Sequence, residues 1–207
     1  MTRRPQCPQC LRPLPYCVCA HVQVVAHRTR VLVLQHPDEH RHPLNTARLA
    51  LLGLARAECW VGEVFSALGA RLAAARQPAL LFPGPAAHML EQGHALDLPA
   101  PDLLIVPDGT WRQAGRLVRG NPPLDEVPRL SLPAGAASRY RVRRAAREDA
   151  VSTIEAIVRT LAALEPDTDF TPVLRPFEAM IEGQIRAMGE QAYARHQAMS
   201  RKRSGPG

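Results

Sequence analysis

Long apolar runs are missing from this sequence. The longest, such as Leu49-Ala50-Leu51-Leu52, fall far short of the ~20 residues that span a bilayer. No segment near Met1 joins a charged stretch to an apolar one, which is the pattern of a secretory signal. These two absences argue against membrane-spanning and secreted proteins, so we expect a cytoplasmic protein without a membrane partner.

Lysine is almost absent as well, because Lys202 is the only lysine among 26 basic residues. The basic residues outnumber 19 acidic ones and give a formal net charge of +7. Arginine binds phosphate through two parallel hydrogen bonds, so a basic, arginine-rich chain favours a nucleic-acid partner over an acidic metabolite. The alternative is a GC-rich genome, which replaces lysine with arginine throughout and is consistent with the abundant alanine and proline.

Length and pattern predict one α/β unit. The chain has 207 residues, of which 46% are hydrophobic, enough for one sizeable core but short for two full domains. Strand-like and helix-like segments alternate through most of the chain, which predicts a mostly parallel sheet. The expected strands are residues 30–35, 59–61, 79–82, 103–106 and 127–132. The expected helices are residues 47–54, 67–75, 86–92, 111–119, 153–164 and 176–199.

Cysteine is scarce but clustered, since four of the five cysteines lie between positions 7 and 19. In a cytosolic protein this clustering indicates a metal site and not disulfides. Cys7 and Cys10 form a CxxC pair and Cys17 and Cys19 a CxC pair, which together can close a tetrahedral zinc site. Such a site has no open position for catalysis, so we expect a structural zinc that folds an N-terminal knuckle. Reduced bystander thiols and an iron–sulfur cluster are the alternatives.

The rest of the chain is organised around residues 103–114. Leu103-Leu104-Ile105-Val106 is typical of a strand buried on both faces, and the carboxyl end of such a strand is where α/β folds bind ligands. Asp108 lies there, followed by Gly109, which allows close backbone approach, and by Trp111, which can stack on a flat ring. The alternative is structural: Thr110 caps the helix, Asp108 makes a turn and Trp111 fills the core.

The first expected strand ends at residues 36–43, which contain three histidines and two carboxylates. Because Pro37 opposes a helix, His36 and His40 should not share a helical face, and this weakens a metal interpretation. We expect a polar loop beside a substrate site. Asn45 is a natural helix cap, and the helix N-terminus at Thr46 suits a phosphate or a carboxylate.

Three further segments have both functional and structural interpretations. Phe82-Pro83-Gly84-Pro85 predicts a rigid turn whose backbone amides suit an adenine edge or a ribose, or else a plain connection. Ser152 to Glu155 has the pattern of a capping box. Arginines beside Tyr140 can bind phosphates and stack on a base, although a solvated strand edge has the same pattern. These arginines are Arg139, Arg141, Arg143 and Arg144.

The chain resembles the DTW-domain family. Asp108-Gly109-Thr110-Trp111 matches the Asp-x-Thr-Trp motif after which that family is named. Matching pieces flank it in the same order: the four clustered cysteines, His36-Pro37 to Asn45-Thr46-Ala47, Phe82-Pro83-Gly84, and Ser152-Thr153-Ile154-Glu155-Ala156. Together they cover about residues 7 to 160, and the joint match is specific although each piece alone is not. The region after Glu165 has no matching motif.

The family members that the chain resembles are bacterial tRNA-uridine aminocarboxypropyltransferases. The resemblance implies a SPOUT-like fold with a knotted S-adenosylmethionine site, and transfer of the 3-amino-3-carboxypropyl group to N3 of a tRNA uridine. We expect a zinc knuckle in residues 1–24, a catalytic core in 25–165, and a C-terminal helix with a basic tail in 166–207. The expected contacts to S-adenosylmethionine are Thr46, Phe82, Pro83, Gly84, Val106, Trp111, Leu132 and Thr153. The four arginines Arg139, Arg141, Arg143 and Arg144, with the tail at 201–203, are the expected tRNA contacts.

The expected chemistry suits these residues. N3 of uridine carries a proton and needs a positioned base, for which Asp108 is the candidate. The sulfonium of S-adenosylmethionine is already activated, so no catalytic metal is required, and Thr46 is the candidate for holding the carboxylate of the transferred arm. Two alternatives remain open at this point: a methyltransferase on the same fold, and a non-enzymatic RNA-binding zinc-knuckle protein. The sequence does not indicate an oligomeric state.

Overall fold

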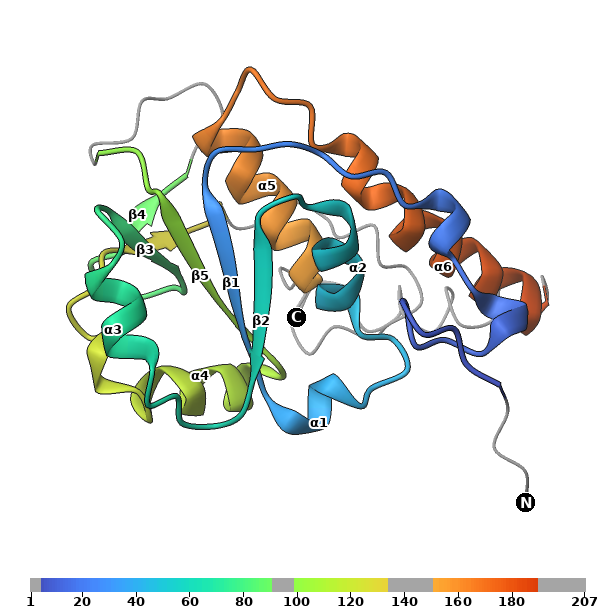
Figure 1. Ribbon diagram of the computed structural model, residues 1–207, viewed down its shortest axis with the longest axis horizontal. Helices are drawn as coiled ribbons and strands as arrows, with labels where there is room; N and C mark the ends of the chain where they lie inside the picture. Colours follow the sequence, from blue (N-terminus) through green and yellow to red (C-terminus); the bar gives the residue numbers. More distant parts are fainter. Residues whose placement is uncertain (1–4, 91–98, 134–150, 190–207) are drawn as a thin grey trace, which may run out of the picture.

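A computed structural model of the chain describes residues 5–90, 99–133 and 151–189 (Figure 1). Its centre is a six-stranded sheet in the order β2-β1-β5-β3-β6-β4, in which every pair of neighbouring strands is parallel. The strands are β1 (Arg30–Gln35), β2 (Ala57–Val61), β3 (Pro78–Leu81), β4 (His88–Met89), β5 (Leu103–Asp108) and β6 (Arg129–Ser131). The helices are α1 (Pro37–His40), α2 (Thr46–Gly53), α3 (Leu68–Ala73), α4 (Trp111–Arg119), α5 (Thr153–Leu164) and α6 (Thr171–Met188). The predicted α/β fold with a mostly parallel sheet is confirmed.

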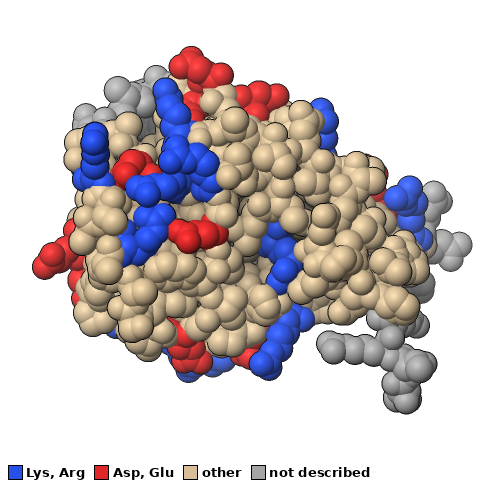
Figure 2. Space-filling view, in the orientation of Figure 1, with Lys and Arg blue, Asp and Glu red and all other residues tan. Residues whose placement is uncertain are grey.

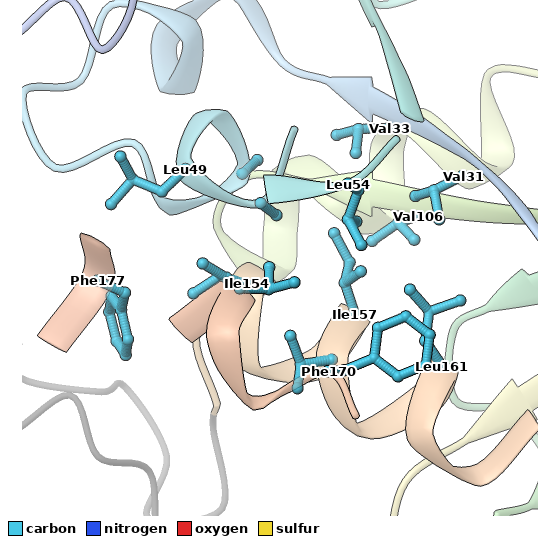
Figure 3. Close-up of a cluster of buried hydrophobic side chains, with 14 of the residues drawn as sticks. Val31, Val33, Leu49, Leu54, Val106, Ile154, Ile157, Leu161, Phe170 and Phe177 are labelled. Atoms are coloured by element: carbon cyan, nitrogen blue, oxygen red, sulfur yellow. The ribbon is translucent and has the colours of Figure 1, made fainter. Parts of the chain in front are cut away.

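The paired strands β1 and β5 are apolar on both faces because helices cover both faces of the sheet. Alternate residues of a strand point to opposite faces, and here they enter two different cores. Val31, Val33, Leu104 and Val106 pack with α2, α5 and α6. Figure 3 shows Val31, Val33 and Val106 in this cluster. Leu32, Leu34, Leu103 and Ile105 pack with side chains of α3 and α4 on the other face. The sheet is therefore the middle of three layers.

Most of the predicted elements are confirmed, but the described part of the helix predicted at residues 86–92, which is residues 86–90, is not helical. His88–Met89 is instead the strand β4, which pairs with β6 in the register His88↔Leu130. The amide of Leu90 then donates to the carbonyl of Ser131 at 2.8 Å. Pairing with a distant strand outweighs the local helical preference of this segment.

Two predictions about helices that contain proline are wrong. Pro37 does not oppose a helix, because it occupies the first turn of α1, where its missing N–H has no intrahelical partner to lose. The last helix begins at Thr171 and not at residue 176, with Pro176 inside it. Val173 and Phe177, on either side of Pro176, are fully buried, so core packing holds the helix together across this proline.

The C-terminal helix α6 belongs to the same core as the sheet. Phe170, Val173, Phe177 and Met180 pack in one hydrophobic cluster with residues of α2 and α5. The division of the chain into three parts at residues 24 and 165 stays a prediction. So does the knotted cofactor site, because the connection from β6 to α5 includes residues 134–150, which are outside the described residues. None of the described helices is both long enough and apolar enough to cross a membrane.

Candidate active site at the carboxyl ends of β1 and β5

The site lies where two neighbouring strands end side by side. In the β1–β5 pair, Gln35 is in register with Asp108, and these are the last residues of their strands. After β1 the chain passes to α2 on one face of the sheet, and after β5 it passes to α4 on the other. Chains that leave neighbouring strands toward opposite faces open a crevice between them, which is where α/β sheets bind ligands.

Asp108 is buried at this carboxyl edge of the sheet, with 4% of its surface exposed. Gln35 Nε2 donates to Asp108 Oδ2 at 2.7 Å, and the hydroxyl of Thr153 donates to Oδ1. These two bonds orient both oxygens, and a carboxylate offers about four acceptor positions in all. Side chains from β1 and from α5 thus hold the carboxylate that the sequence motif singles out.

Gln35 is a candidate site residue that the sequence motifs did not single out. It is 1% exposed, and its amide exchanges two hydrogen bonds with the amide of Asn45, at 3.1 and 3.2 Å. His40 Nδ1 lies 3.0 Å from Gln35 Oε1. The available signal was a polar residue at the end of an apolar strand, the same signal that drew attention to Asp108.

Asn45 therefore has two roles. Its Oδ1 accepts from the amide of Arg48 at 3.0 Å and caps α2, as predicted, and its side chain also fixes Gln35. Thr46, the first residue of α2, is buried next to it. The cap thereby places the N-terminus of α2 close to Asp108.

The surroundings of Asp108 keep neighbouring groups uncharged. Burial, together with the charge of the Asp108 carboxylate, raises the pKa of the Cys59 thiol to about 11. Burial lowers the pKa of His40, and the charges of Arg48 and Arg41 lower it more. A neutral His40 with its proton on Nδ1 can donate to Gln35 Oε1, which is the arrangement that the 3.0 Å contact requires.

An aromatic pair lies on the other side of Asp108. Phe82 directly follows β3 and Trp111 begins α4, and their ring centroids are 6.3 Å apart with planes inclined at 54°. Trp111 is 48% exposed, so the alternative in which it fills the core is wrong. Phe82 is half-buried, so the exposed face of the pair is mainly that of Trp111, which is suited to stacking on a flat ring.

The turn between β5 and α4 has a structural explanation. Thr110 and Gln113 form a reciprocal capping box, so the predicted cap at Thr110 is confirmed. Gly109 has φ of +155°, and a Cβ there would lie 3.0 Å from Gln113 Cβ. Gly109 is therefore required by the backbone conformation and by the packing of Gln113. The capping box predicted at Ser152 and Glu155 is confirmed in the same way.

The remaining predicted contacts are spread more widely. Val106 is buried in the core shared with α2 and α5, and Leu132 packs against that core. Pro83 and Gly84 follow β3, where a Cβ on Gly84 would meet the Arg129 guanidinium at 3.0 Å. The four predicted RNA-binding arginines and the basic tail are outside the described residues: Arg139, Arg141, Arg143, Arg144 and positions 201–203.

The N-terminal cysteines form a compact cluster. Their four sulfur atoms lie within 4.8 Å of one another, with Cys7–Cys19 at 3.6 Å and Cys10–Cys17 at 3.8 Å. A tetrahedral zinc with bonds of ~2.3 Å separates its sulfur ligands by about 3.8 Å, so the cluster fits that ion. Backbone amides of Cys10 and Gln9 directed at the Cys7 sulfur lower its pKa to about 6, which favours the thiolate that a metal binds. The four cysteines could therefore hold a metal ion.

Comparisons with known proteins identify the family of the chain. The family model described as "DTW domain" matches residues 4–185. A Drosophila melanogaster protein named tRNA-uridine aminocarboxypropyltransferase 2 is 31% identical over 194 residues, which cover 88% of this chain and 76% of that protein. The Macaca fascicularis protein of the same name is 30% identical over 89% of this chain, but the match covers 65% of its own length. An Arabidopsis thaliana tRNA-uridine aminocarboxypropyltransferase A is 30% identical over 80% of this chain and 74% of its own. No solved structure matches the chain significantly.

Proposed function

The chain belongs to the DTW domain family, and we propose that it transfers the 3-amino-3-carboxypropyl group of S-adenosylmethionine to N3 of a uridine in tRNA. Relatives that match over most of this chain carry the name of that activity. The observation that carries the proposal is the buried carboxylate of Asp108, oriented by Gln35 and Thr153 at the crevice between β1 and β5.

Asp108 is proposed as the general base. A carboxylate is a weaker base than the uridine anion, so the N3 proton passes to Asp108 as the new bond forms and not before. The bond from N3 to the aminocarboxypropyl carbon forms, the bond from that carbon to sulfur breaks, and its electron pair stays on sulfur, which releases methylthioadenosine. Because the sulfonium is a good leaving group, the placement of Asp108 matters more than its basicity.

The other predicted residues have proposed positions around this reaction. Phe82 and Trp111 stack on the adenine, with backbone groups at Pro83 and Gly84 along its edge. Thr46, at the positive end of α2, holds the carboxylate of the transferred arm. Val106 and Leu132 support the pocket from the core side, and Thr153 keeps Asp108 in place.

A structural zinc in the cysteine cluster is proposed as well. The four sulfurs match a closed tetrahedral site, which would stabilise the knuckle and leave no position for substrate. Metal analysis of the purified protein should give about one zinc per chain, and Cys7→Ser and Cys17→Ser should each lose most of it. If the zinc content stays the same in both variants, the cluster is not the zinc site. Cys59→Ser is the matched control, because Cys59 lies apart from the cluster, beside Gln35.

Product analysis tests the activity. With unmodified tRNA and S-adenosylmethionine, the protein should produce 3-(3-amino-3-carboxypropyl)uridine, detected by mass spectrometry of the nucleosides, and methylthioadenosine. Release of S-adenosylhomocysteine with a methylated nucleoside would mean a methyltransferase on the same site. Binding of tRNA without binding of S-adenosylmethionine would mean an RNA-binding protein without this activity. A tRNA substrate also implies a cytoplasmic location, which is part of the proposal.

A further inference from the structure

We propose that a pocket between the cysteine knuckle and the α1–α2 connection binds a backbone phosphate of the RNA substrate. This inference rests on the proposed function, since it assigns part of the RNA to a surface that lies outside the crevice of Asp108. The pocket has a volume of about 380 Å³, and its wall combines knuckle residues with residues between positions 40 and 49. Its basic side chains are Arg12, Arg41 and Arg48, with His40 and His42 beside them.

The charge of this pocket has one sign. No aspartate or glutamate of the described residues contributes to its wall. Within the same part of the chain, neither Arg41 nor Arg48 forms a salt bridge with a carboxylate. The charges of the pocket also act on His40. Burial is the main cause of its lowered pKa, and the positive charges of Arg48 and Arg41 lower that pKa further. On the face drawn in Figure 2, basic side chains emerge from a recess next to α2.

Arg12 joins the two halves of the pocket wall. Its Nε donates to the carbonyl of Tyr16 in the knuckle at 3.0 Å, and its Nη1 donates to the carbonyl of Pro43 in the α1–α2 connection at 3.3 Å. The guanidinium is thereby held in one orientation before any ligand arrives, which reduces the entropy cost of binding. The knuckle thus has a second proposed role besides its own folding, because it forms one wall of a basic pocket.

A phosphodiester suits the pocket better than the zwitterionic arm of S-adenosylmethionine. The arm carries an ammonium as well as a carboxylate, and the described wall has no acidic side chain to receive the ammonium. A phosphodiester carries one negative charge and no positive one, and each guanidinium can donate two parallel hydrogen bonds to it. Three arginines around one cavity are therefore matched to phosphate.

The pocket is also in the right place for RNA bound at Asp108. Asn45 forms part of its wall, and the side chain of Asn45 bonds to Gln35, which bonds to Asp108. A uridine with N3 at Asp108 extends its backbone away from this carboxylate, and the pocket is a basic surface that adjoins it. The phosphate contact would fix the register of the RNA without reading its sequence.

The test measures binding of unfractionated tRNA to Arg41→Gln, to Arg48→Gln and to the double variant over a series of salt concentrations. Each single variant should weaken binding by roughly 10-fold at low salt, and should lower the slope of log affinity against log salt by about one for each phosphate that it no longer binds. Arg76→Gln is the matched control, since Arg76 is exposed and precedes β3 at the amino-terminal edge of the sheet. It removes the same charge and should leave the slope unchanged.

Two further measurements distinguish a phosphate site from a site for S-adenosylmethionine or a role in zinc binding. Affinity for S-adenosylmethionine and zinc content should stay the same in Arg41→Gln and Arg48→Gln. An unchanged salt slope, in a protein that still modifies tRNA, would overturn the pocket and leave the proposed function standing. Lower affinity for S-adenosylmethionine with unchanged tRNA binding would assign the pocket to the aminocarboxypropyl arm. Loss of zinc with an unchanged salt slope of tRNA binding would mean that the arginines only neutralise the negative charge of the cysteine thiolates. If the unaltered protein bound neither tRNA nor S-adenosylmethionine, the proposed function itself would fail.

Discussion

Two buried carboxylates, Glu165 and Asp108, lie at opposite ends of the paired strands β1 and β5. Glu165 is 2% exposed and accepts hydrogen bonds from the backbone amides of Arg28 and Thr29, at 2.7 to 3.1 Å, just before β1 begins. Asp108 is 4% exposed and accepts from the side chains of Gln35 and Thr153, where β1 and β5 end. Burial is nearly equal at the two sites, but the donors differ.

The kind of donor indicates what each carboxylate does. Backbone amides have a direction set by the fold, so Glu165 ties the end of α5 to the start of β1. Burial raises the pKa of Glu165, whereas the hydrogen bonds from the amides of Thr29 and Arg28 lower it. The hydrogen bonds outweigh burial, so the pKa of Glu165 lies below its ordinary value. Side-chain donors come from different elements and can adapt to a substrate. The amino ends of the strands thus form a structural region, and the carboxyl ends form the proposed reactive region.

The surface near the amino ends fits the structural assignment. Arg30 pairs with Asp102 at 2.8 Å, and Asp102 also accepts from the amide of Gln77 at 2.8 Å. His27 accepts from the amide of Arg56 and lies 2.8 Å from the carbonyl of Thr29, with a pKa lowered chiefly by burial. In Figure 2, basic and acidic side chains are interspersed over this end of the molecule. Charges that are paired with one another are poorly suited to binding a ligand.

Replacement of Asp108 should have the largest effect and gives the sharpest contrast between the two regions. Asp108→Asn is nearly isosteric, so the fold and the binding of S-adenosylmethionine should persist while the rate of transfer falls by roughly 10²–10⁴-fold, the usual range for a general base. Single-turnover kinetics with tRNA would measure it. Near-normal turnover would make Asp108 a structural residue, and the base would then be sought at His36 or Glu155.

Replacement of Glu165 should have the opposite profile. In Glu165→Gln the new NH2 group faces a backbone amide that has lost its acceptor, which should lower the free energy of unfolding by about 1–3 kcal/mol. Turnover at a temperature where the variant is folded should be unchanged. Urea unfolding measures the difference, with Glu182→Gln on the exposed surface of α6 as the control for loss of charge. A loss of turnover without a loss of stability would break the proposed division.

Lowering the pH should reveal the contribution of Glu165 to stability as a smaller effect. The pKa of Glu165 in the folded protein lies below its ordinary value of 4.5, so its stabilisation is present above about pH 4.5 and disappears as the pH falls through the lower, folded value. Glu165→Gln cannot lose this contribution. The gap in stability between wild type and variant should therefore narrow below about pH 4.5. Because both proteins have the same cysteines, release of metal by acid cancels in the comparison.

Replacement of Gln35 tests whether the side chains that orient Asp108 affect the rate of the reaction. Gln35→Leu removes a donor to Asp108 while leaving the carboxylate in place, so kcat should fall by roughly 10-fold, less than for Asp108→Asn. KM for S-adenosylmethionine should change little. Gln77→Leu, at the amino end of β3, is the matched control and should keep the wild-type kcat. Equal kcat values in the two variants would argue against a positioning role for Gln35.

Trp111 should give the smallest change. Its ring is 48% exposed, so Trp111→Ala should weaken binding of S-adenosylmethionine by roughly 2–10-fold because stacking on the adenine is removed, with little loss of stability. Phe82→Ala should behave similarly, because the two rings lie 6.3 Å apart. Calorimetric titration with S-adenosylmethionine measures both variants. Unchanged affinity for S-adenosylmethionine in both variants would mean that the adenine binds at another part of the carboxyl edge.

Local sequence determined the features that depend on near neighbours. The helix caps at Asn45, Thr110 and Ser152 use a donor three residues away, so their geometry follows from the backbone itself. The apolar run at residues 30–35 predicted a strand, and the run at 103–106 predicted a strand buried on both faces, because only a sheet covered by two layers can hold it. The spacing of the four cysteines predicted a cluster for the same local reason.

Tertiary structure decided the contacts between distant residues. Gln35 meets Asp108 across 73 positions, Thr153 meets Asp108 across 45, and Glu165 meets Thr29 across 136. These contacts depend on the order of the strands and on the register that sets Gln35 against Asp108, which no short stretch of sequence specifies. The same reason explains β4 and the helix that continues past Pro176, where pairing with β6 and burial against α2 and α5 override what the local residues favour.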